Sequence, residues 1–187
     1  MRDVGLDPSI LPSLLRYVPE TGNLFWLQRP ASFFNETATR TAEHACASWN
    51  ARWAGRQGFT ARNKDGYHHG TILQIHHLAH RVIWALQTGA WPKDEIDHQD
   101  TDPGNNRWIN LREATHAENM RNQRTPITNK SGIRGVFWHG GNQSWCAAIS
   151  HENKNHTLGY FDSKEDAAKA YAEASARLHG NFGRITA

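Results

Sequence analysis

Cysteine is scarce in this chain, and no long apolar run is present. The two cysteines, Cys46 and Cys146, form no C-x-x-C pair, so neither a disulfide framework nor a cysteine zinc site is expected. No segment approaches the roughly 20 apolar residues that cross a bilayer, and the first residues lack the apolar core of a signal peptide. These absences argue against a membrane or secreted protein and predict a cytoplasmic one.

One stretch of the chain also lacks acidic residues: no Asp or Glu occurs between Glu118 and Glu152. The basic side chains in that stretch are Arg121, Arg124, Lys130 and Arg134. The whole chain of 187 residues has a formal net charge of +3, which favours an acidic partner only slightly. A local basic stripe without acidic neighbours suits a phosphate backbone, although a solvated linker has the same composition.

What the chain does contain is a compact group of polar side chains between residues 95 and 122. Asp97 and His98 lie in a short predicted strand, and Asn110 lies in a second one at residues 108–111. Residues 102–106 between them favour a turn. Thr115 is followed three residues later by Glu118, which is the pattern of a capping box, so a helix is expected to begin near residue 116. Asn119 would then lie one turn inside this helix.

These residue types suit the hydrolysis of a phosphodiester. A hard cation such as Mg²⁺ prefers oxygen ligands and keeps several waters, so the oxygens of Asp97 and Asn119 can hold it. His98 suits the general base, and the carbonyl of Asn110 can accept from its other ring nitrogen and fix the tautomer. The alternative is a surface ion pair at a strand end. Asp102, Asn105 and Asn106 are interpreted as turn residues.

Residues 66–124 resemble the His-Asn-His (HNH) endonucleases with a ββα-metal core, in the phage and intron-homing branch whose last His is replaced by Asn. The resemblance implies that His98 and Asn110 are catalytic, and that Asp97 and Asn119 bind a divalent metal, Mg²⁺ or Mn²⁺. The terminal Asn argues against tight binding of Zn²⁺. Ahead of the motif, residues 66–75 are predicted as a strand and residues 79–88 as a helix ended by Gly89.

Five histidines lie in or beside that strand and helix, but no shared metal site is expected from them. Side chains on a strand alternate between faces, which separates neighbouring rings. Hydrogen bonding of the rings, or contact with a DNA backbone, is the preferred interpretation. The five are His68, His69, His76, His77 and His80.

Beyond residues 125–131, a predicted linker, the apolar pattern changes to alternation. Three strands are expected at 133–139, 145–150 and 156–161, followed by a helix that begins at Ser163 and is capped through Asp166. The sequences Gly-Ile-Arg-Gly-Val at 132–136 and Leu-Gly-Tyr-Phe-Asp at 158–162 are similar to the plant ethylene-response-factor (APETALA-type) DNA-binding domain. That family reads the major groove with the sheet face opposite its helix.

The resemblance implies a set of DNA-contacting side chains, although the arginines that dominate the plant domain are mostly replaced here. Only Arg134 remains for a bidentate guanine contact. The expected DNA-binding residues are Arg121, Arg124, Lys130, Arg134, His139, Lys154, Asn155 and Thr157.

The predicted fold class is α+β, with a ββα-metal nuclease core followed by a three-stranded antiparallel sheet packed on one helix. The predicted divisions are an N-terminal hairpin and irregular region (1–65), the nuclease domain (66–124), the linker (125–131) and the DNA-binding domain (132–187). The predicted function is metal-dependent hydrolysis of duplex DNA by a homing-type endonuclease with site preference. It would act as a monomer or as a dimer assembled on DNA, in the host cytoplasm if a phage encodes it.

Two other functions fit parts of the pattern. The first is a non-catalytic DNA-binding regulator, which the intact set of four site residues argues against. The second is an HNH nuclease accessory to phage DNA packaging, which the additional DNA-binding region argues against.

Overall fold

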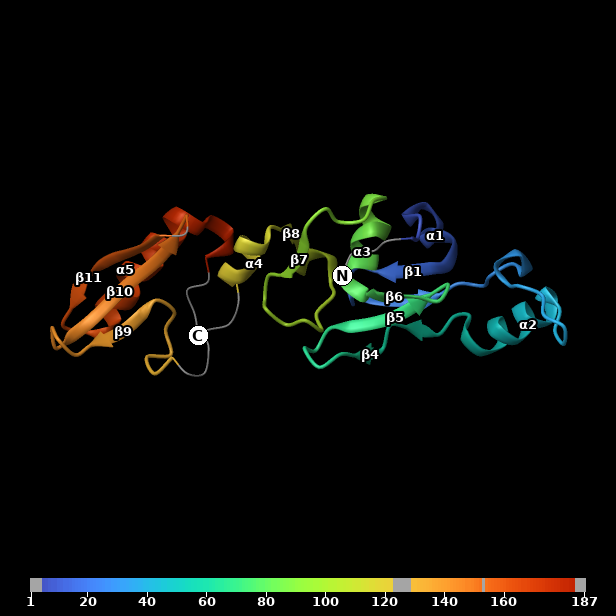
Figure 1. Ribbon diagram of the computed structural model, residues 1–187, viewed down its shortest axis with the longest axis horizontal. Helices are drawn as coiled ribbons and strands as arrows, with labels where there is room; N and C mark the ends of the chain where they lie inside the picture. The colour runs from blue at the N-terminus through green and yellow to red at the C-terminus, as the bar shows by residue number, and fades with distance from the viewer. Residues whose placement is uncertain (1–4, 123–128, 153, 184–187) are drawn as a thin grey trace. The chain divides into compact units, whose positions relative to one another are not determined.

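The computed structural model describes residues 5–122, 129–152 and 154–183. The chain forms two compact units, Met1–Glu113 and Ala114–Ala187. Figure 1 shows several small sheets and short helices in these units. The mixture of small antiparallel sheets and separate helices agrees with the predicted α+β class. The unit boundary lies inside the predicted nuclease segment 66–124, so the four-part division stays a prediction.

The first unit contains three small sheets. Strands β1 (Leu15–Val18), β2 (Asn23–Trp26) and β3 (Gln57–Gly58) form one antiparallel sheet. Strands β4 (Ala61–Arg62), β5 (His68–Ile72) and β6 (Ile75–Leu78) form a second. Strand β7 (Glu95–His98) pairs with β8 (Leu111–Ala114), which ends at the unit boundary.

Helix α3 (Ala79–Thr88) lies in the core of the first unit, where the sequence predicted it. Its side chains Val82 and Ile83 are fully buried, and it contacts α1 (Leu11–Leu14) as well as β5, β6 and β7. Full burial of each such side chain stabilises the fold by about 1.5–3 kcal/mol. Gly89 ends the helix with a φ of +77°, a left-handed conformation that favours glycine.

Four further helices lie in the described part of the first unit. The 3-10 helices η1 (Pro8–Ile10) and η2 (Ala31–Phe33) precede α1 and α2, respectively. Helix α2 (Ala42–Trp53) lies in the region expected to be irregular. Thr41 caps its first turn, but none of its residues is buried, which explains why the sequence shows no apolar stripe there. Residues 108–110, expected as strand, form the 3-10 helix η3 (Trp108–Asn110) instead.

The second unit begins with α4 (His116–Asn122) and continues into the predicted three-stranded sheet. Strands β9 (Val136–His139), β10 (Ser144–His151) and β11 (Lys154–Phe161) pair antiparallel in the order β11-β10-β9. Helix α5 (Lys164–His179) packs on this sheet and is followed by the 3-10 helix η4 (Gly180–Phe182). The predicted arrangement of three strands on one helix is confirmed.

Small residues let α5 approach its sheet closely. Ala167 and Ala174 are buried against Ala147 and Ile149 of β10 in one apolar cluster. Ser163 accepts a hydrogen bond from the backbone N–H of Asp166, as its position three residues ahead predicted. Across the described ranges of the chain, the structure contains no helix with the length and apolar character needed to traverse a bilayer.

Candidate active site

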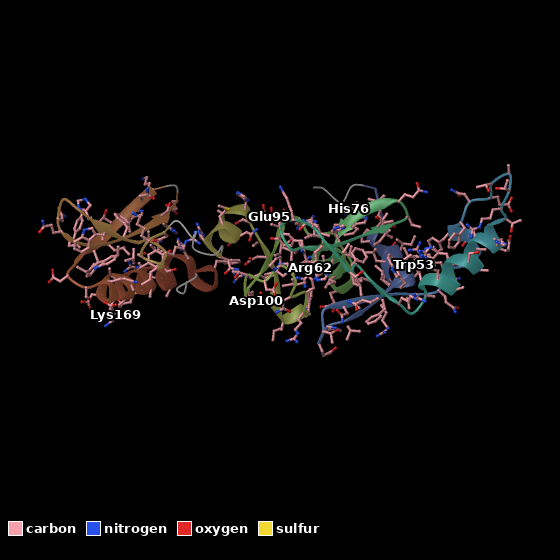
Figure 2. All side chains as sticks on the ribbon, turned by 90° about the horizontal axis from the view of Figure 1, so that it is seen from below. Trp53, Arg62, His76, Glu95, Asp100 and Lys169 are labelled. Carbon is pink, nitrogen blue, oxygen red and sulfur yellow. The ribbon has the colours of Figure 1, made fainter. Side chains whose placement is uncertain are left out.

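Asp97 and His98 occupy the end of β7, and both residues are buried, with 3% and 4% of their whole-residue surface exposed. A loop of turn residues connects this strand to η3 and β8. Figure 2 labels Glu95 at the start of β7 and Asp100 in the loop. A carboxylate and an imidazole at one strand end, buried beneath a polar loop, are unusual for residues with a purely structural role.

The imidazole of His98 contacts Asn106 and two neighbouring aromatic rings. Its Nε2 lies 3.1 Å from Oδ1 of Asn106. The ring makes an edge contact with His80, at a centroid distance of 5.1 Å, and packs on Tyr67 at 5.7 Å. Burial lowers the pKa of His98 below its ordinary value of 6.5, against the opposing effects of the Asn106 hydrogen bond and of Asp100. The ring is therefore neutral near pH 7, as a general base requires.

Asp97 is paired with a cation from the neighbouring strand. Arg112 of β8 donates to the Oδ2 atom of Asp97 from Nε at 2.8 Å and lies within 2.7 Å of the same oxygen through Nη2. The side chains of Arg112 and Asp97 are only 16% and 4% exposed. Because both charges are shielded from water, their pairing compensates part of the free energy that their burial costs. Arg112 was not among the site residues predicted from the sequence.

Asn110 organises the loop. Its Oδ1 accepts from the backbone N–H of Asp100 at 3.0 Å, and its Nδ2 donates to Oδ1 of Asp100 at 3.0 Å and to the carbonyl of Asn105 at 2.7 Å. Burial alone would raise the pKa of Asp100, but hydrogen bonds from Asp102, Asn105 and Asn110 hold it below its ordinary value. Asn110 thus ties both ends of the loop together.

The contact with the imidazole that was expected of Asn110 is made by Asn106, which the sequence analysis had assigned to turn formation. Both residues are asparagines in one polar loop, so the sequence offers little to separate their roles. The signal that distinguishes them is tertiary. The N-terminal hairpin formed by β1 and β2 supports Asn106 from residues far away in the sequence.

That support consists of three contacts. The hydroxyl of Tyr17 donates to the carbonyl of Asn106 at 2.8 Å. The backbone N–H of Trp108 donates to the carbonyl of Pro19 at 3.3 Å. Gly22, with a φ of +78°, lies so close that a Cβ atom there would be 2.6 Å from the carbonyl carbon of Asn106. The hairpin turn therefore needs glycine at this position, for both its φ and its close approach.

Asn119 lies on α4, in the second unit. Its backbone N–H donates to the carbonyl of Thr115, which places it one turn inside the helix as predicted. The capping box is confirmed, since Thr115 N–H donates to Oε2 of Glu118 at 2.8 Å and Glu118 N–H donates to the Thr115 hydroxyl at 3.3 Å. Because α4 and β7 belong to different units, the convergence of Asn119 with Asp97 stays a prediction.

The expected DNA-binding residues fall into several environments. Register places His139, Thr157 and Asn155 opposite Ser144, Ala148 and Ser150 of β10, on the sheet face that alternates with the buried Ala147 and Ile149. Lys130 and Lys154 are exposed, and Arg121 is half-buried. Arg124 lies outside the described residues.

Arg134 makes contacts that the sequence analysis did not foresee. Its Nη1 donates to the carbonyl of Arg121 at 3.0 Å and its Nη2 to the carbonyl of Met120 at 2.9 Å. These carbonyls belong to the last turn of α4, where helices leave acceptors without an intrahelical partner. The guanidinium thus caps α4 in this structure.

Two of the five histidines form a hydrogen-bonded pair of rings, which is the interpretation preferred from the sequence. Nε2 of His76 and Nδ1 of His69 are 2.8 Å apart, with ring centroids at 4.7 Å. Antiparallel pairing of β5 with β6 brings these two rings to one face, which a single-strand argument cannot show. Hydrogen bonding of the rings is confirmed here and for His68, whose Nδ1 lies 2.9 Å from the carbonyl of Phe59. Within the described ranges, no group of three or more His, Cys, Asp or Glu side chains is arranged to hold a metal.

Comparison with known proteins identifies the class of one domain of this chain. A family model described as HNH endonuclease matches residues 77–121, a range that contains Asp97, His98, Asn110 and Asn119. The chain thus carries an HNH endonuclease domain. It is also 36% identical over 107 residues to protein 3.8 of Escherichia phage T7, an alignment that covers 57% of this chain and 88% of that protein. The chain belongs to the same family as phage T7 protein 3.8. No solved structure matches it.

Proposed function

We propose that this protein is a metal-dependent endonuclease that hydrolyses phosphodiester bonds in duplex DNA. The observation that supports this most directly is His98, a buried imidazole with a lowered pKa, inside the segment that matches the HNH endonucleases. A neutral imidazole beside a carboxylate is the arrangement that a general base for water activation needs. The same domain in a non-catalytic regulator would have no use for this costly burial.

The donor chemistry suits a hard divalent cation. Asp97 and Asn119 would hold Mg²⁺ or Mn²⁺ through a carboxylate and an amide oxygen, and water would complete the coordination. A zinc cage of three or four His and Cys ligands does not fit the described residues. When bound, the cation would stabilise negative charge on the phosphate and on the leaving oxygen.

The chain's own residues would carry the remaining steps. His98 takes a proton from the attacking water, whose oxygen forms a bond to phosphorus while the bond to the 3′ oxygen breaks. The departing 3′ oxygen takes a proton from solvent, so the products are a 5′-phosphate and a 3′-hydroxyl. Asn106 holds the imidazole through Nε2, so in the tautomer with hydrogen on Nε2 the lone pair that accepts the proton is on Nδ1. Arg112 fixes the orientation of Asp97.

The second unit would position the nuclease on DNA. Its open sheet face carries His139, Asn155 and Thr157, in the place where the APETALA-type domain reads the major groove. Arg121, Lys130 and Lys154 would contact phosphates. Because Arg134 is engaged with α4, readout of guanine by arginine is not expected from this face. Site preference of the homing type is part of this proposal.

Cleavage of supercoiled plasmid tests the proposal. With Mg²⁺ or Mn²⁺ the protein should produce nicked or linear DNA, and EDTA should stop the reaction. The His98→Ala variant should still bind the plasmid in a gel-shift assay, but it should cleave the DNA about 10²–10⁴-fold more slowly. His44→Ala, which removes an exposed histidine of α2, is the matched control. A full metal-dependent rate in His98→Ala would refute the assignment of the base, and DNA binding without cleavage by the unmodified protein would favour a regulator.

A further inference from the structure

The first unit contains a cavity of about 510 Å³ that the nuclease site does not use. It lies among β2, β3, the loop of η2, helix α2 and the hairpin of β5 and β6. Aromatic rings form much of its wall, including Trp26, Phe34, Trp49 and Phe59. Its volume is within the range of pockets that bind small molecules and cofactors.

Arg29 is the cation of this cavity, and it is buried without a carboxylate. It is 7% exposed, and its guanidinium lies over the ring of Trp49 at 3.9 Å and over that of Trp26 at 5.0 Å. Its Nε is buried and has no hydrogen-bond partner. No carboxylate pairs with it anywhere in the part of the chain that the structure describes. Burial lowers the pKa of Arg29.

The position of Arg29 is fixed through its backbone. Asn50 of α2 accepts from the N–H of Arg29 at 2.9 Å and donates to its carbonyl at 2.9 Å. Ring stacking compensates only part of the free energy that burial of a cation costs. An anion bound in the cavity would supply the missing compensation through charge-assisted hydrogen bonds.

The floor of the cavity consists of buried aromatic rings that pack closely on the backbone. A Cβ atom at Gly58 would lie 2.7 Å from Nε1 of Trp26, and one at Gly70 would lie 3.0 Å from the ring of Phe59. Both rings therefore lie directly against the backbone. Above this floor, Phe34 and Trp49 are half-buried, and Trp53 at the end of α2 (Figure 2) is 38% exposed. Helix α2 buries none of its own residues, so aromatic surface remains available to a flat ligand.

We propose that this cavity binds one unstacked nucleotide, with the base against the aromatic rings and the phosphate on Arg29. A nucleotide has a flat π-system that can stack on the aromatic rings and a negative charge that can pair with Arg29. The choice of a nucleotide rests on the proposed nuclease function, which brings the protein to DNA. The bound nucleotide is either an unpaired or flipped nucleotide of a DNA strand or a free mononucleotide.

Binding can be measured without cleavage. The probe is a short single-stranded oligonucleotide with one 2-aminopurine, mixed with the whole protein in EDTA, where stacking on the rings should quench the fluorescence of the base. The 5′-monophosphate of 2-aminopurine deoxyriboside and the same nucleoside without phosphate are tested alongside. The phosphate-bearing probes should bind more tightly than the nucleoside. Binding of the oligonucleotide alone assigns the site to a strand, and equal binding of the mononucleotide assigns it to free nucleotides.

Two variants test the cavity independently. Arg29→Gln should weaken binding by about tenfold, whereas Arg16→Gln should not, although Arg16 also stacks on a ring, at 4.7 Å from that of Phe25. Thr71→Trp introduces a bulky ring from an exposed strand position on the cavity wall and should weaken binding similarly without unfolding the protein. Thermal melting confirms that each variant is folded. Affinities equal to that of Arg16→Gln in both variants would overturn the inference.

The outcomes also separate this inference from the proposed function. Loss of quenching in Arg29→Gln and Thr71→Trp, together with no cleavage by the unmodified protein, would support the cavity and refute the nuclease. Cleavage with unchanged quenching in these two variants would do the reverse.

Discussion

The guanidinium of Arg112 and the carboxylate of Asp97 meet on two neighbouring strands, and both donor nitrogens of Arg112 approach the same oxygen, Oδ2, at 2.7 and 2.8 Å. The pair is largely withdrawn from water. A buried pair of this kind adds little net stability over an apolar pair, but the loss of one partner leaves the other charge uncompensated. The fold therefore depends on Asp97, the candidate metal ligand, for part of its stability.

Arg112→Met should therefore destabilise the protein by about 3–5 kcal/mol, measured by urea unfolding. Arg107→Met, which removes an exposed arginine from the adjoining loop, should change the free energy of unfolding by less than about 0.5 kcal/mol. The double variant with Asp97→Asn should recover part of the loss, because no charge is then left unpaired. A double variant that is less stable than Arg112→Met would contradict the ion-pair interpretation.

Gly22 offers a second test, because its contact with the site is steric. Gly22→Ala and Gly89→Ala both place a Cβ on a backbone with φ near +78°, which costs about 1–2 kcal/mol in each case. Only Gly22 has backbone atoms of Asn106 and Arg107 within 3.0 Å, whereas nothing lies within 4 Å at Gly89. Gly22→Ala should cost about 1–3 kcal/mol more, and it alone should slow DNA cleavage. Equal losses in the two variants would show that the hairpin does not support Asn106.

The role of Asn106 can be separated from that of Asn110 by the pH dependence of cleavage. Asn106→Asp places a carboxylate beside His98, which favours the imidazolium and raises the pKa of His98. The acid limb of the rate profile should then move to higher pH. Asn110→Ala should reduce the rate through a loosened loop and leave the limb in place. A shift of the acid limb in Asn110→Ala instead would assign the imidazole contact to that residue.

Stability should depend on pH through the same histidine. The pKa of folded His98 lies below its unfolded value near 6.5, so the unfolded chain takes up a proton first as the pH falls. The stabilisation is fully present above pH 6.5 and is lost as the pH falls through the lowered pKa. From about pH 7 to about pH 5, the unmodified protein should lose more unfolding free energy than His98→Gln, which cannot titrate. Parallel curves for the two proteins would contradict a buried neutral imidazole.

Elements with local signals could be predicted from the sequence. Helix α3 carries an apolar stripe and a terminal glycine, and the capping box before α4 is complete within four residues. The three strands β9 to β11 alternate clearly, and α5 follows its own cap. In each case, the interactions that define the element lie within a few residues, so a single sequence contains them.

The features that could not be predicted depend on long-range contacts. Asn106 was taken for a turn residue because its distinguishing partner, Tyr17, is 89 positions away. The pairing of His69 with His76 requires the register of two strands. Helix α2 buries no residue, so its sequence shows no apolar period. The residues proposed for catalysis were found through their spacing, whereas the residues that hold them in place emerged only from the fold.

Arg134 provides the last test, because its position on the sequence suggested DNA while its contacts suggest a helix cap. Loss of the two hydrogen bonds to α4 in Arg134→Ala should destabilise the second unit by about 1.5–3 kcal/mol. Arg134→Lys should recover only part of this loss, because an ammonium cannot donate in the same fork to two carbonyls.

DNA affinity measured over a series of salt concentrations distinguishes the two roles. The logarithm of the DNA-binding constant falls linearly with the logarithm of the salt concentration, and the steepness of this line is the salt slope. Lys154→Ala should lower the salt slope by about one, as the loss of a phosphate contact does, whereas Arg134→Ala should leave it unchanged. Trypsin should instead cleave Arg134→Ala faster near α4, because the helix has lost its cap. A reduced salt slope in Arg134→Ala, together with unchanged stability, would show that Arg134 contacts DNA and does not cap α4.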